Sequence, residues 1–260
     1  MTLLALLFNL GFLGGILSGW LGIGGGIVMA PLLLYATTLL NVGPLSMKEV
    51  AGLTMAQGFF AALSGGIAHK RRRLVCKKLI LYMGSSILVG SFIGSITSKF
   101  APAELLKGVF SALALTAAGL MCFPKAEEGA TKDADAVEFH RGLAFLIPLV
   151  LGFFLGLVGQ AGAFILIPVM LYVLKIPTRI AIGSSLGIVF LSASAGLFGK
   201  LITGQVPVLQ ASALVLGALV GAQVGGHLSV RTETRTLRRA LASLIALVAI
   251  GMWYELLGGR

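Results

Sequence analysis

Acidic residues are scarce in this sequence, which has nine Asp and Glu against 20 Lys and Arg in 260 residues. Charged residues of both signs make up only 11% of the chain, whereas hydrophobic residues make up 57%. About a quarter of the residues are charged in a typical soluble domain, so this composition excludes that class. We therefore predict a multi-pass integral membrane protein, and we expect it in the bacterial inner membrane.

Cysteine is almost absent as well. Cys76 and Cys122 are the two in the chain, and neither belongs to a CxxC motif. This spacing argues against a metal or redox site, so we interpret both as unpaired thiols and predict no metal and no cofactor. An HExxH motif is also missing, which disfavours a zinc-dependent hydrolase. A sulfur-handling enzyme that uses one of the two thiols remains an alternative.

No carboxylate stands in the middle of an apolar segment, because the acidic residues lie in loops or at segment ends. A proton pump or cation channel usually carries such a group within the membrane. Glu49 and His69, near segment ends, are the candidates if transport is coupled to protons. Basic residues cluster in short loops, so they indicate membrane topology and not a nucleic-acid partner.

Apolar segments bounded by charges, proline or glycine form two sets of five. The first set is 3–22, 26–40, 49–68, 79–98 and 104–123, and the second is 142–159, 162–174, 179–198, 208–228 and 238–257. Most reach the roughly 20 residues that span a bilayer, whereas 26–40 and 162–174 are short and either cross or re-enter. We predict an all-α fold with a first repeat at 1–123, a charged cytoplasmic linker at 124–141 and a second repeat at 142–260.

The two halves resemble each other. A shift of 137 residues brings the glycines and the proline around the first short segment onto their counterparts: Gly15, Gly19, Gly22, Gly25 and Pro31 fall on Gly152, Gly156, Gly159, Gly162 and Pro168. If each half crosses the membrane five times, the two halves have inverted orientations, and 15 of the 20 Lys and Arg residues lie on one side of the membrane. Four crossings per half would make the halves parallel and would divide the basic residues almost evenly. Positive residues favour the cytoplasm, so inverted halves are preferred, with both termini outside.

Glycine is dense at one place in each half. Gly22 and Gly24 to Gly26 lie within five residues of an apolar run, and each costs about 1 kcal/mol relative to alanine in a helix. We therefore predict a helix break whose free N–H groups line a protein-enclosed cavity. The helix that resumes after the break suits an anion. A tight turn between packed helices is the alternative for these glycines.

Other glycines are spaced by four residues, which is typical of close helix packing in membranes. We predict packing faces at Gly11, Gly15 and Gly19, at Gly90 and Gly94, and at Gly221 and Gly225.

Small polar side chains in the apolar segments could hold the oxygen atoms of an oxyanion, although Ser and Thr often bond to their own helix backbone instead. We expect no buried basic residue to neutralise a substrate, and hence weak binding. The predicted substrate-binding residues are Gly22, Gly24, Gly25, Gly26, Thr54, Gln57, Gly159, Gln160, Gly162, Ser184 and Ser185.

Three stretches resemble the TauE/SafE sulfite exporter family: LSGWLGIGGGIVMAPLLL (17–34), its weaker copy LGLVGQAGAFILIPVML (155–171), and AIGSSLGIVFLSASAG (181–196). The resemblance covers essentially the whole chain and implies transport of small sulfur-containing anions such as sulfite, sulfoacetate, thiosulfate or related organosulfonates. It implies site elements at both breaks, including Pro31 and Pro168. The sequence departs from the family pattern at Ala161 and Ala163, where glycines are expected.

We therefore predict a secondary transporter, an exporter, of small sulfur-containing anions that works by alternating movement of two inverted halves. Its expected partners are the anionic substrate and membrane lipids, with a homodimer as a further option. A channel-like anion pore and an uptake transporter for another small anion are the alternatives. A membrane scaffold or metal-stress protein would leave the glycine breaks unexplained.

Overall fold

The computed structural model describes residues 3–21, 26–40, 42–43, 45–70, 75–122 and 139–258. Within these ranges the regular elements are all helices, without a strand. They are α1 (Leu3–Leu21), α2 (Gly26–Leu39), α3 (Met47–Lys70), α4 (Lys77–Thr97), α5 (Ala103–Cys122), α6 (Arg141–Val158), α7 (Ala163–Pro168), the π-helix η2 (Val169–Val173), α8 (Thr178–Ile202), α9 (Val208–Arg231) and α10 (Thr234–Gly258). Each of the ten predicted segments coincides with a helix, and α7 with η2 forms the seventh. The all-α prediction is confirmed.

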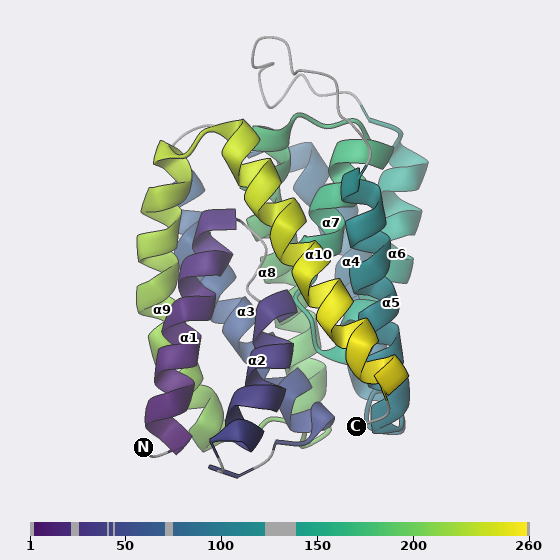
Figure 1. Ribbon diagram of the computed structural model, residues 1–260. Coiled ribbons are helices and arrows are strands. Elements are labelled where there is room, and N and C mark those ends of the chain that lie inside the picture. The colour runs from purple at the N-terminus through teal and green to yellow at the C-terminus, as the bar shows by residue number, and fades with distance from the viewer. Residues whose placement is uncertain are drawn as a thin grey trace.

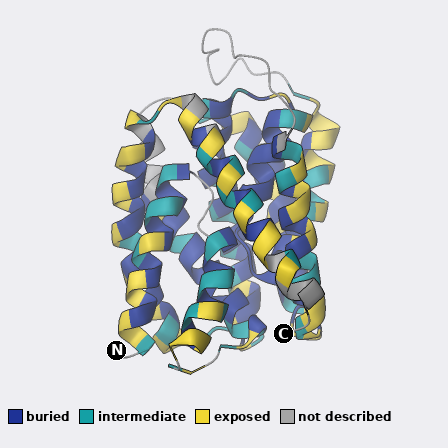
Figure 2. Cartoon of the chain, in the orientation of Figure 1, coloured by how far each residue is buried: buried dark blue, intermediate teal, exposed yellow. Residues whose placement is uncertain are grey.

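Within the described ranges, six helices are long and apolar enough to cross a membrane, namely α1, α4, α5, α6, α8 and α9. Large apolar side chains are exposed on the outward faces of the bundle, for example Leu146 and Val150 on α6 and Val220 and Val224 on α9 (Figure 2). Water would disfavour so much exposed apolar surface, but the lipid chains of a bilayer accommodate it. The protein is a multi-pass membrane protein.

Both termini lie at the same end of the bundle (Figure 1). From this end α1 runs inward and α2 returns, then α3, α4 and α5 alternate in direction, so that α5 ends at the opposite face. The second half starts at that opposite face with α6 and ends with α10, which crosses the front of the bundle diagonally. Helix α2 begins part-way along the molecule and not at either face.

Helices of different halves form the tightest pairs, α1 with α9 and α4 with α6. At Gly94 of α4 an added Cβ would strike the carbonyl of Phe153 on α6, and at Gly225 of α9 it would strike the carbonyl of Ile16 on α1. The same holds for the other glycines of the predicted packing faces, which face backbone of the partner helix at Gly11, Gly15, Gly19, Gly90 and Gly221. The packing-face prediction is confirmed.

Helices α3 and α8 contact each other, and α3 also contacts α1, α2 and α9. In α8 the residues from Thr178 to Lys200 are mostly buried, including the polar Ser184, Ser185 and Ser192. These two helices hold eight of the 18 polar or charged residues that are buried in the described part of the chain.

Candidate functional site

The second helix break is present where the glycines predict it. Helix α6 stops at Val158 and is closed by Gly159, whose φ of 74° is left-handed, while the N–H of Gln160 donates to the carbonyl of Leu155 at 2.8 Å. Gly162, with φ 96°, then precedes α7. Residues other than glycine rarely adopt these backbone angles. The two glycines therefore permit the chain to reverse its direction inside the bundle.

In the first half, helix α1 ends at Leu21 and helix α2 begins at Gly26. Three of the predicted site residues, Gly22, Gly24 and Gly25, lie outside the described residues. Gly26 is buried and forms the first residue of α2.

Thr54 connects α3 to the second break. Its Oγ1 lies 2.7 Å from the carbonyl oxygen of Gly159, to which it can donate a hydrogen bond, and 2.8 Å from that of Val50 in its own helix. The residue is fully buried. Thr54 thus positions the break in addition to any contact with a substrate.

We expect Thr54→Val to lower the melting temperature of the purified protein, because it leaves the buried carbonyl of Gly159 without this donor, at a cost of about 1–3 kcal/mol. Thr37→Val is the matched control, since the buried hydroxyl of Thr37 bonds only the Leu33 carbonyl one turn earlier, at 2.7 Å. Thermal unfolding in detergent compares the two. Equal melting temperatures for both variants would contradict the link between α3 and the break.

Gln57 and Gln160 have the most unusual surroundings of the predicted site residues. Both are 0% exposed, and none of their four amide N and O atoms has a hydrogen-bond partner in the described part of the chain. Buried polar groups are nearly always paired, so four unpaired atoms in two side chains require an explanation such as a ligand, an ion or water. Two predicted residues are therefore the strongest candidates for contact with a transported molecule.

The two amides approach the same helix. A Cβ placed at Gly14 on α1 would lie closest to the Nε2 of Gln57 and to the sulfur of Met29, so Gln57 lies near the Met29 side chain of α2. A Cβ placed at Gly26, the first residue of α2, would lie closest to the Oε1 of Gln160. Gly26 and Met29 are three residues apart, or about 5 Å along α2. An amide from each half thus lies beside the first turn of α2, where the helix N-terminus favours negative charge.

Two further buried hydroxyls, those of Ser18 on α1 and Ser192 on α8, also lack a partner among the residues that the structure describes. Neither serine is among the residues predicted to bind the substrate. Serine in a helix often donates to the carbonyl one turn earlier, as Ser194 does to Phe190 at 2.6 Å, so an unpaired serine cannot be recognised from its sequence position.

The remaining predicted residues have roles within the fold. The Ser184 hydroxyl accepts from the backbone N–H of Cys76 at 3.0 Å at the start of α4, and Ser185 donates to the carbonyl of Ile182 at 2.7 Å. Glu49 forms a capping box with Ser46, because the backbone N–H of Ser46 donates to the carboxylate of Glu49 at 2.8 Å. The side chain of His69 lies outside the described part of the chain.

The expectation that no basic residue is buried is wrong. Lys200 is 0% exposed, and its Nζ donates to the Ser98 Oγ at 2.8 Å and to the Gln205 Oε1 at 3.3 Å. The predicted apolar segment ends at residue 198, which would place Lys200 in the following loop. Helix α8 instead continues to Ile202 and carries the lysine inside.

Comparison with known proteins gives a consistent picture. The sequence model of the family described as sulfite exporter TauE/SafE matches residues 7–252. A probable membrane transporter protein of Bacillus subtilis, YunE, is 29% identical, and the match covers 96% of this chain and 97% of the relative. A probable membrane transporter protein of Methanocaldococcus jannaschii is 25% identical, and the match covers 97% of this chain and 96% of the relative. A probable membrane transporter protein of Haemophilus influenzae is 23% identical, and the match covers 98% of this chain and 99% of the relative. No solved structure matches the chain closely enough for comparison.

Proposed function

This chain belongs to the sulfite exporter TauE/SafE family and is a membrane transporter, and on that premise we propose that it exports small sulfur-containing anions such as sulfite, sulfoacetate or related organosulfonates. The observation that carries the proposal is the pair of unpartnered amides of Gln57 and Gln160 beside the start of α2.

These groups suit an oxyanion chemically. Each amide has an NH₂ group with two donors, and the first N–H groups of α2 have no acceptor within the helix. Several such donors can share the oxygen atoms of one sulfite or sulfonate group, while the partial positive charge of the helix N-terminus favours its negative charge. Because all of these donors are neutral, binding at this position is weak, which favours release.

The arrangement of the halves supports inverted repeats at 1–123 and 142–260, joined by a cytoplasmic linker at 124–141. Exchanging α1–α5 with α6–α10 converts the pair α1–α9 into α6–α4, α2–α3 into α7–α8, and α5–α7 into α10–α2, and all of these pairs are in contact. In transporters built this way, movement of one repeat against the other exposes a central site to each side in turn. Gln160 of the second half contacts Gly26 of the first, so such a movement would separate the two amides.

The test uses an alanine that displaces one amide without disturbing the fold. A Cβ at Gly26 meets the end of the Gln160 side chain, which can move aside. We expect one sulfur anion, in a panel of sulfite, thiosulfate, sulfoacetate, taurine, sulfate and phosphate, to raise the melting temperature of the purified protein. Gly26→Ala should weaken the affinity of this site for the anion by about tenfold or more and so reduce the rise in melting temperature, because a charge-assisted hydrogen bond contributes about 1.5–3 kcal/mol.

Gly108→Ala is the matched control, because Gly108 is also a helical glycine but a Cβ there meets nothing within 4 Å. The proposal is wrong if Gly26→Ala retains the full stabilisation, or if phosphate and sulfate stabilise the protein as well as every sulfonate does. The anion that passes this test is then taken into liposomes. Saturable flux with counterflow supports a transporter, whereas flux that neither saturates nor shows counterflow identifies a pore.

A further inference from the structure

Lys200 has no role in the central site, yet it is completely buried in the last turn of α8. Its ammonium donates to two neutral acceptors, the Ser98 hydroxyl at the end of α4 and the Gln205 side chain in the loop after α8. Among the described residues it forms no ion pair with a carboxylate. A buried ammonium is costly unless a negative charge accompanies it, so this position favours an anion.

The surroundings of Lys200 increase this preference. Lys48 at the start of α3 is close enough for the two positive charges to repel, and its Nζ donates to the carbonyl of Lys99 at 2.7 Å. The Gln205 amide is held by its own bonds, since its Nε2 donates to the Thr203 hydroxyl at 2.6 Å. The cluster is therefore a fixed frame of neutral oxygen atoms with an excess of positive charge.

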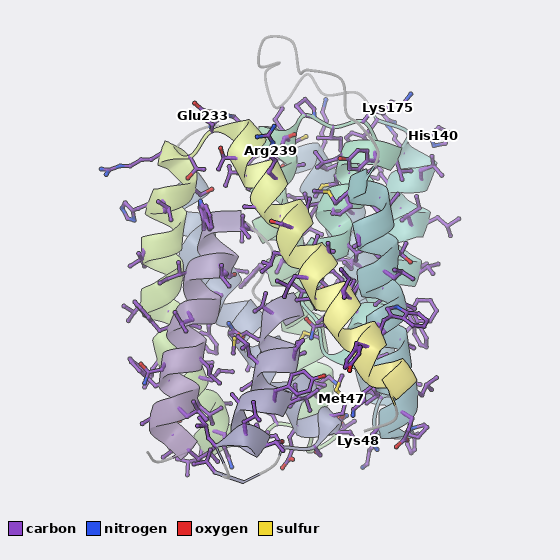
Figure 3. The ribbon with its side chains drawn as sticks, viewed as in Figure 1. Met47, Lys48, His140, Lys175, Glu233 and Arg239 are labelled. Carbon is purple, nitrogen blue, oxygen red and sulfur yellow. The ribbon has the colours of Figure 1, made fainter. Side chains whose placement is uncertain are left out.

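The cluster lies between the central site and one face of the membrane protein. Lys48 lies at the end of the bundle that holds both termini (Figure 3). The carbonyl of Gln205 is the atom closest to a Cβ placed at Gly52 on α3, and Gly52 precedes Gln57 by five residues, or about 8 Å along the helix. The Lys200 cluster therefore lies on the side of Gln57 that faces this end of the bundle.

We propose that Lys200 and Ser98 form a second anion-binding site, which takes a small oxyanion of the class transported, on the route between the central site and the face where the termini lie. The identity of the anion rests on the proposed function, whereas the site itself does not. The ammonium supplies the charge, and the Ser98 hydroxyl, which donates to the Ser95 carbonyl at 2.6 Å in this structure, can turn to supply a further donor. Because Lys200 belongs to the second half and Ser98 to the first, the anion would be held by both halves.

The experiment measures thermal stabilisation of the purified protein by sodium sulfite, with sodium sulfate as a second probe and gluconate keeping the ionic strength constant. Two independent sites contribute separately to stabilisation. Lys200→Met should therefore remove about half of the sulfite-dependent rise in melting temperature, which is the part due to the Lys200 site. Gly26→Ala should remove the remaining part, which is due to the central site. The double variant should show none. Lys200→Arg, which keeps the charge, should retain more of the effect than Lys200→Met.

Lys99→Met is the matched control, because Lys99 follows Ser98 in the chain but is exposed. It should leave the stabilisation unchanged, which separates a specific site from general positive charge. Ser98→Ala provides a second variant of the site if Lys200→Met does not fold, and it should reduce the effect in the same direction.

The outcomes separate the two proposals. Full stabilisation in Lys200→Met, with loss in Gly26→Ala, would overturn the second site and leave the proposed function standing. Loss in Lys200→Met with full stabilisation in Gly26→Ala would support the second site and overturn the central one. Complete loss in each of the two single variants would mean that Lys200 and Gly26 serve one shared site, and it would overturn the inference of a second one.

Discussion

Gly159→Ala is expected to leave little folded protein at temperatures at which the wild type is intact. Two costs add at this position. A left-handed φ of 74° costs a residue with a Cβ about 1–2 kcal/mol. In addition, the new Cβ would collide with the carbonyl oxygen, Cα and Cβ of Ala51 on α3, and none of these atoms can turn aside. Overpacking of this kind costs about 1–3 kcal/mol more.

Gly204→Ala separates these two costs. Gly204 has a similar φ of 71°, but a Cβ there meets nothing within 4 Å. Its alanine variant should therefore lose only the conformational part, and its melting temperature should lie clearly between those of the wild type and Gly159→Ala. Thermal unfolding and gel filtration in detergent measure both variants. If the two alanines lower the melting temperature equally, the close approach of the break to α3 is wrong.

Gly94→Ala and Gly225→Ala form the second prediction, with a comparably large effect. The two glycines correspond in the two halves, and a methyl group at either would strike a backbone carbonyl of the opposite half, that of Phe153 or of Ile16. A backbone carbonyl cannot yield as a side chain can, so the helix pair must separate and lose packing along its length. We expect each variant to lower the free energy of unfolding by about 1–3 kcal/mol.

The controls are Gly108→Ala and Gly251→Ala, which also introduce alanine into helices but meet nothing within 4 Å. These should be neutral or slightly stabilising, since alanine has the higher helix propensity. Similar effects of the two packing glycines would support the correspondence of the halves. A neutral result at either one would contradict the helix contact in that half.

Most of the fold could be predicted because its signals are local. Runs of apolar residues reveal each membrane helix, and glycines at intervals of four reveal faces at which helices touch. Gly159 and Gly162 indicate the break for an equally local reason, since few other residues tolerate the backbone angles found there. Helix ends were less predictable, and the extension of α8 past residue 198 altered the interpretation of Lys200.

The candidate site was predictable only in part, because its properties arise from tertiary contacts. Thr54, Gln57 and Ser184 look alike in the sequence as polar residues within apolar segments. In the structure the hydroxyls of Thr54 and Ser184 have backbone partners from distant segments, whereas the amide of Gln57 has none. The difference depends on which helices surround each side chain, and a single sequence does not contain that information.

The pairing of α1 with α9 has a consequence for how the chain is made. Gly11 packs on Leu214, about 200 residues later, so the ribosome must finish most of the protein before the glycine face of α1 meets its partner. At roughly 5–20 residues per second this takes about 10–40 s. During biosynthesis the first helix therefore waits in the lipid with its glycines uncovered, and the first half cannot complete its packing alone.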